Sequence, residues 1–123
     1  DEQEVRFSDW VEMDVARPLR RGMFVAKILG HSMEPKIPDG AYGLFAYAPS
    51  PAHGAVVLAQ LSDRNDPETN SRYTVKVFDR SELHRRKLTL RPLNPAFQPR
   101  EFDLTEETDQ PVRIIAELLE VLS

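Results

Sequence analysis

Residues 112–122 read Val112-Arg113-Ile114-Ile115-Ala116-Glu117-Leu118-Leu119-Glu120-Val121-Leu122, and this run can be scored as a helix or as a strand. Glu117, Leu118 and Leu119 favour a helix, because all three are good helix formers. However, Pro111 comes directly before the run and the run begins with β-branched residues, which favours a strand. We therefore predict a C-terminal strand.

The rest of the chain also reads as short strands. Ten prolines and five glycines divide it into pieces that alternate or are continuously apolar. The expected strands are residues 24–29, 42–47, 55–61, 73–78 and 87–90. Turn residues separate them at 38–40, 49–51 and 92–95, and a polar connection lies at 62–72. We predict a mostly β fold with little helix.

The length of 123 residues suits a single domain, residues 1–123, with one core. Residues 1–21 are harder to interpret. Within them Val11, Met13 and Val15 alternate with acidic residues, as a strand would. We expect an N-terminal arm or strand there.

Composition excludes several classes of protein. Sixteen Lys and Arg against twenty Asp and Glu give a net charge of −4, which argues against direct nucleic-acid binding. The lack of cysteine excludes disulfides, Cys-ligated metals and a thiol nucleophile. No apolar run is long enough to span a membrane, so we expect a soluble, cytoplasmic protein without membrane contact. The chain begins without Met, as a fragment of a longer protein would.

The first candidate for chemistry is Ser32, within Gly30-His31-Ser32-Met33-Glu34-Pro35. This serine follows an apolar strand at a position suited to a helix N-cap, and a simple cap is the common role of such a residue. The functional alternative is a nucleophile whose backbone N–H, with that of Met33, forms an oxyanion hole. Gly30 would then support the site by allowing a close backbone approach.

The second candidate is Lys76, in the middle of an expected strand. Alternation places Lys76 on one face with Thr74 and Phe78, and Val75 and Val77 on the other. A lysine in mid-strand usually extends to water or protects a sheet edge. If its face is covered, desolvation lowers its pKa toward that of a general base, and Thr74 would be a neighbour in the site.

Other catalytic arrangements are weaker. A Ser-His-Asp triad needs a histidine bonded to the serine, but the side chain of His31 should point away from Ser32, and His53 and His84 lie in polar turns. Ser32 and Lys36 are one residue too far apart for the S-x-x-K element. Because no histidines or carboxylates share a ligand spacing, we expect no metal site, and nothing implies a cofactor.

Five blocks of the sequence together resemble the Ser-Lys peptidase domain of LexA, UmuD and phage repressors. They are Phe24–Pro35, Ile37–Gly40, His53–Ala59, Tyr73–Phe78 and Leu90–Pro95, and their order and spacing match across residues 22–122. The resemblance implies a LexA-like, small and barrel-like β fold. It also implies Ser32 as the nucleophile, Lys76 as its general base, and a homodimer formed through the C-terminal strands.

Two features depart from the family pattern. The connection 62–72 is longer than the tight hairpin expected there. Family members also cut themselves at a small-residue–Gly bond upstream of the serine, whereas the five glycines here follow Arg21, Leu29, Asp39, Tyr42 and His53. The scissile bond therefore lies upstream in a longer chain, or the chain is already processed, or it acts on another chain or not at all.

Three functions remain open. The first is an autoproteolytic serine endopeptidase that cleaves a stress-response or phage-type regulator, for which the resemblance suggests a RecA filament, or another DNA-damage or defence partner, as co-activator. The second is a non-catalytic dimerisation and interaction module, like a processed UmuD-type accessory factor. The third, a membrane-associated signal peptidase, is weakened because the sequence lacks a membrane anchor.

Overall fold

The computed structural model describes residues 5–6, 21–48, 50–62, 71–80, 87–104 and 111–122. Within these ranges every regular element is a strand and none is a helix. The prediction of a mostly β fold is confirmed. The ambiguous run Val112–Leu122 is one continuous strand, with the bounds that we expected.

Eight strands are described: β1 (Val5–Arg6), β2 (Met23–Ile28), β3 (Tyr42–Tyr47), β4 (Val56–Leu61), β5 (Tyr73–Asp79), β6 (Lys87–Arg91), β7 (Arg100–Asp103) and β8 (Val112–Leu122). The six predicted strands are all present, within one residue at each end. Strand β7 was missed, because three of its four residues are charged and only Phe102 gives an apolar signal. Strand β1 lies in the N-terminal region for which we expected an arm or strand.

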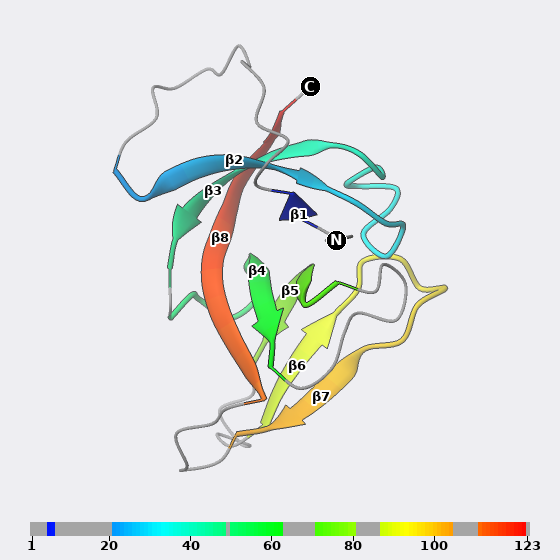
Figure 1. The fold of residues 1–123 in the computed structure, drawn as a ribbon. Helices are drawn as coiled ribbons and strands as arrows, with labels where there is room; N and C mark the ends of the chain where they lie inside the picture. The colour runs from blue at the N-terminus through cyan, green and yellow to red at the C-terminus, as the bar shows by residue number, and fades with distance from the viewer. Residues whose placement is uncertain are drawn as a thin grey trace.

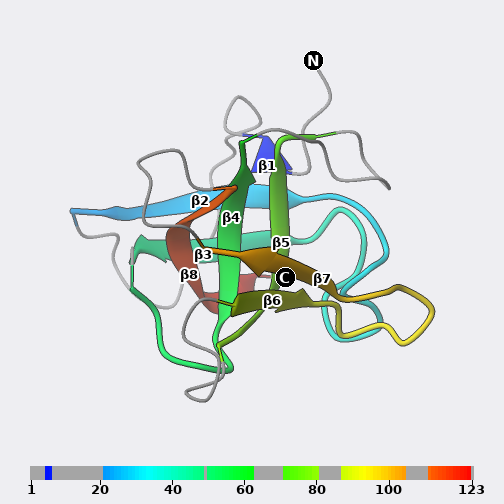
Figure 2. The same cartoon turned by 90° about the horizontal axis from the view of Figure 1, so that it is seen from below.

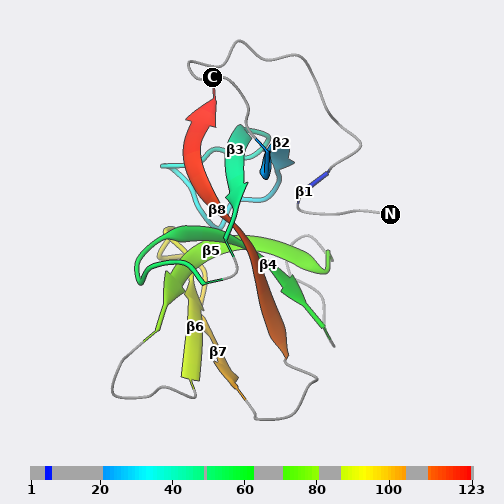
Figure 3. The same cartoon turned by 90° about the vertical axis from the view of Figure 1, so that its left-hand side faces the viewer.

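All eight strands form one antiparallel sheet in the order β1-β2-β3-β8-β4-β5-β6-β7. Strand β8 joins its two parts. Residues 112–117 of β8 pair with β4, and residues 116–122 pair with β3 on the other edge. In Figures 1 and 3, β8 accordingly runs from the group formed by β4 to β7 up to β2 and β3.

The sheet is strongly curled, and β4 and β5 run across the direction of β2 and β3 in Figure 2. Buried residues lie on both faces of the central strands. One cluster, called here the first cluster, contains Ala26, Ile28, Met33, Ile37, Phe45, Leu58, Val75, Val77 and Ala116. The second cluster contains Val57, Ala59, Leu61, Phe78, Leu88, Leu90, Phe102 and Val112. Both faces of β4 are therefore covered, which explains its continuous apolar sequence.

The apolar side chains of β8 are also used within the chain. Ile115 and Leu118 pack against the first cluster, Ile114 against the second, and Leu119 against a third cluster of Val25, Leu44 and Leu122. Along β8, strand β4 pairs with residues 112–117 on one edge and strand β3 pairs with residues 116–122 on the other. Among the described strands, only Ala116 and Glu117 therefore have a partner strand on both edges.

Several expectations concern residues that the structure does not describe. They are the alternation at Val11, Met13 and Val15, most of the arm at residues 1–21, and the turn around His84. The polar connection 62–72 is described only at its ends, where β4 stops at Leu61 and β5 begins at Tyr73. Eleven residues therefore separate these two strands, as the sequence suggested.

Candidate active site

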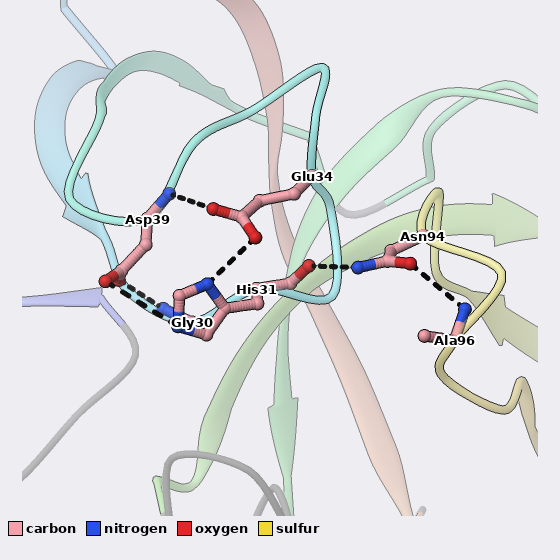
Figure 4. Close-up of polar contacts among 6 residues, drawn as sticks. All are labelled: Gly30, His31, Glu34, Asp39, Asn94 and Ala96. Carbon is pink, nitrogen blue, oxygen red and sulfur yellow. Dashed lines mark hydrogen bonds and ion pairs between the residues drawn. The ribbon is translucent and has the colours of Figure 1, made fainter.

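Ser32 lies in the loop between β2 and β3, and hydrogen bonds within this loop define its path. The N–H of Glu34 donates to the carbonyl of His31 (3.1 Å), and that of Ile37 donates to the carbonyl of Met33 (2.9 Å). Gly30 has a φ of +103°, in the left-handed region that favours glycine. Its N–H donates to Asp39 Oδ1 (2.7 Å), so the beginning of the loop is bonded to its end (Figure 4).

The side chain of Ser32 is buried, with only 2% of the residue exposed. Its Oγ has no hydrogen-bond partner among the residues that the structure describes. Residues 32–36 form turns and not a helix, so the helix-cap interpretation of Ser32 is wrong. A buried hydroxyl that bonds to no protein group is uncommon in native structures and is often explained by function.

Lys76 lies in β5, which is flanked by β4 on one side and β6 on the other. Only 6% of the residue is exposed, so it neither extends to water nor protects a sheet edge. Its Nζ donates to Thr74 Oγ1 (2.6 Å). This contact confirms that Lys76 and Thr74 share a face of the strand, as the alternation indicated.

The loop of Ser32 is anchored in the same core as the strand of Lys76. Met33 and Ile37 belong to the first cluster together with Val75 and Val77, the two neighbours of Lys76 in β5. We expect the side chains of Ser32 and Lys76 to lie within hydrogen-bonding reach, or somewhat farther apart without a substrate. No hydrogen bond joins them in this structure, since Ser32 Oγ has no partner among the described residues. The role of the pair thus remains a prediction.

Neither described histidine, His31 or His53, completes a triad with Ser32, because the Ser32 hydroxyl has no hydrogen-bond partner among the described residues. The imidazole of His31 is exposed and bonds to Glu34 Oε1 through Nδ1 (2.8 Å). His53 accepts a hydrogen bond from the N–H of Arg80 at Nδ1 (3.1 Å). In the described part of the chain, no group of three or more His, Asp or Glu residues could hold a metal ion.

Asn94 is a contact of the Ser32 loop that the sequence did not single out. It lies in the loop between β6 and β7, and its backbone N–H donates to the carbonyl of Ser32 (2.9 Å). Its side-chain Nδ2 donates to the carbonyl of His31 (3.0 Å). In the sequence, Asn94 is noticeable only as part of the block Leu90–Pro95. Its contact with His31, which is 63 residues away, could not be predicted from that block.

A cavity of about 590 Å³ lies elsewhere, between the end of β3, β5, β6 and the first half of β8. Tyr47, Phe78 and Ile114 are among its lining residues, but Ser32 and Lys76 are not. The cavity is therefore separate from the candidate site.

A family model described as Peptidase S24-like matches residues 4–119. This chain belongs to that peptidase family. The match confirms the resemblance to the LexA and UmuD type of peptidase domain, and it begins upstream of residue 22, where we had expected the similarity to start. A search of curated proteins found no match to the chain.

Family membership supports a peptidase-type domain, and the described fold agrees with it. The predicted roles of Ser32, Met33, Gly30, Lys76 and Thr74 are not tested by the match. None of the described segments forms a helix that is long and apolar enough to cross a membrane.

Proposed function

We propose that this domain is a serine endopeptidase with a Ser32–Lys76 dyad. The observation that carries the proposal is the buried Ser32 hydroxyl, which has no hydrogen-bond partner in a chain of the Peptidase S24-like family. Lys76 supports it as well, because its amine is buried and is positioned by a hydrogen bond to Thr74 Oγ1.

The chemistry follows from the two side chains. Neutral Lys76 Nζ accepts the proton of Ser32 Oγ while the oxygen attacks the carbonyl carbon of the substrate. The negative charge that forms on the carbonyl oxygen is stabilised by the N–H groups of Ser32 and Met33. The Lys76 ammonium then donates its proton to the leaving amine, and the acyl-enzyme is hydrolysed by a water that Lys76 deprotonates.

The proposed substrate is a peptide bond in a stress-response or phage-type regulator, upstream in the full-length chain of this domain. The five glycines of the present sequence follow Arg, Leu, Asp, Tyr and His, so none provides the small-residue–Gly bond typical of the family. A DNA-damage signal, such as a RecA filament, is the proposed activator.

A covalent probe for reactive serines tests the dyad without a known substrate. We expect a fluorophosphonate to label the wild-type chain at Ser32, and Ser32→Ala to abolish the labelling. Lys76→Met preserves the bulk of the buried side chain but removes the base, so labelling should slow by about 10²- to 10⁴-fold. Lys76→Ala should have a similar effect.

Ser50→Ala and Lys87→Ala are matched controls, because both residues are exposed and outside the candidate site. Both should be labelled at the wild-type rate. Circular dichroism of each variant checks that the fold is retained. Labelling of folded Ser32→Ala or Lys76→Met at the wild-type rate would contradict the proposed role of that residue.

The second candidate is a non-catalytic dimerisation and interaction module. The observation that favours it is the lack of a family-type cleavage bond among the five glycines. A folded wild-type chain that associates but is never labelled by the probe would support this second function over the first.

A further inference from the structure

Asn94 bonds to two successive peptide groups around Ser32. Its backbone N–H donates to the carbonyl of Ser32 (2.9 Å) and its Nδ2 donates to the carbonyl of His31 (3.0 Å). Its Oδ1 accepts a hydrogen bond from the N–H of Ala96 (3.0 Å), which orients the amide group (Figure 4). Both carbonyl groups therefore point toward the loop between β6 and β7.

The direction of each carbonyl group also fixes the direction of the N–H in the same peptide group. In a trans peptide, the carbonyl of one residue and the N–H of the next point in opposite directions. Because the carbonyls of His31 and Ser32 face Asn94, the N–H groups of Ser32 and Met33 face away from it. Successive N–H groups on one side of the backbone form a concave site for a negative charge.

These two N–H groups are available for such a charge. Among the described residues, no acceptor is bonded to the N–H of Ser32 or of Met33. The neighbouring N–H groups are already used, since that of Gly30 donates to Asp39 and that of Glu34 donates to His31. The two unpaired N–H groups thus lie next to the one buried, unpaired hydroxyl of the loop.

We propose that Asn94 is the residue that positions the oxyanion hole. By holding the carbonyls of His31 and Ser32, it directs the N–H groups of Ser32 and Met33 to the oxygen of the carbonyl under attack. This role rests on the proposed peptidase function. Asn94 does not touch the reacting atoms and acts through the orientation of two peptide groups.

Two substitutions separate this role from simple support of the loop. Asn94→Asp retains an acceptor for the N–H of Ala96 but loses the donor to His31, whereas Asn94→Ala loses both of these side-chain contacts. Both variants keep the backbone N–H that donates to the carbonyl of Ser32. If Asn94 only stabilised its own loop, Asn94→Asp would behave like the wild-type chain. If it positions the oxyanion hole, both variants should react slowly.

The measurement is the rate of fluorophosphonate labelling of Ser32 across a range of probe concentrations. We expect the limiting rate to fall at least about tenfold in both variants, since removing an oxyanion donor costs about 10²- to 10³-fold. The concentration for half-maximal rate should change less than about twofold. Gln98→Ala, an exposed position in the same loop, is the control and should match the wild-type chain. A wild-type limiting rate for folded Asn94→Asp would overturn the proposal.

Amide NMR distinguishes this inference from the proposed peptidase function. We expect the resonances of the Ser32 and Met33 amides to shift in Asn94→Ala and Asn94→Asp, and to remain in place in Gln98→Ala. If the wild-type chain is not labelled but these amides shift, the catalytic proposal fails while Asn94 still orients the two groups. If neither amide shifts in either variant, the positioning role is wrong.

Discussion

At the scale of single residues, burial separates Lys76 from the other described lysines, whereas Ser32 shares its burial with Ser71. The two serines differ in their hydrogen bonds, because Ser71 Oγ accepts one from the N–H of Tyr73 and Ser32 Oγ has no partner among the described residues. Ser32 is 2% exposed and Lys76 is 6% exposed. Burial of a polar group is costly unless it gains hydrogen bonds. Lys76 gains one from Thr74, whereas the Ser32 hydroxyl gains none, so the loop retains Ser32 at the expense of stability.

The rate of serine modification should rise with pH from neutral to mildly alkaline conditions. Only a neutral Lys76 amine can accept the proton of Ser32, so the rate should increase with pH if Lys76 is the base. The measurement is the labelling rate of Ser32 in a series of buffers, with circular dichroism as the check on folding. In Lys76→Met the residual rate should lose this dependence. A rate that is flat or falls with pH in the folded wild-type chain would exclude a lysine base.

At the scale of elements, the close packing of β3 against β8 holds the two parts of the sheet together. Gly43 of β3 is buried at this contact. A Cβ atom at this position would lie 2.7 Å from Leu118 Cδ1, 2.9 Å from Phe45 Cε1 and 3.0 Å from Ile28 Cδ1. The strand pair therefore needs a residue without a side chain at position 43.

Gly43→Ala should destabilise the domain by about 1–3 kcal/mol, the usual cost of overpacking a core. Chemical denaturation followed by circular dichroism measures this change. In a Leu118→Val background, which lacks the closest atom, the added cost of Gly43→Ala should be smaller. An equal cost in both backgrounds would show that contact with Leu118 is not the cause.

At the scale of the whole molecule, β8 joins the two parts of the sheet, and among the described strands only its residues 116–117 have a partner strand on both edges. Within the described chain, residues 118–122 are flanked by β3 on one edge, and no described strand pairs along the other. Val121 is 39% exposed there. An apolar strand bordered on one side is a surface on which a second copy can pair.

We propose a two-fold dimer formed through residues 118–122, since most homo-oligomers are symmetric dimers. Val121→Glu should dissociate it, because the charge would be buried at the interface. Leu119→Glu should do so as well, but Leu119 also packs against the third cluster and its loss can weaken the fold. Sedimentation velocity over a concentration series measures the mass of each variant.

The matched control is Tyr47→Glu, which places the same charge on the other exposed large apolar residue, at the far end of β3. It should sediment as the wild-type chain does. A wild-type chain with monomer mass at every concentration would refute the dimer, whereas dissociation by Tyr47→Glu would contradict an interface formed through residues 118–122.

The strands could be predicted from local sequence because each is a short apolar or alternating piece between turn residues. The same local pattern placed Thr74 and Lys76 on one face of β5, as their hydrogen bond confirms. The local pattern did not predict β7, because Phe102 is the only apolar residue in that strand. The blocks around Ser32 and Lys76 also predicted the family, which the match over residues 4–119 confirms.

The order of strands, the burial of Lys76 and the contacts of Asn94 depend on residues far apart in the chain. A strand pattern states which side chains share a face, but not which strands become its neighbours. The sequence therefore identified Ser32 and Lys76 as candidates and predicted the C-terminal strand. Folding placed that strand between β3 and β4, covered both faces of β5, and bonded Asn94 to the peptide groups of Ser32, because pairing and packing of distant segments set these contacts.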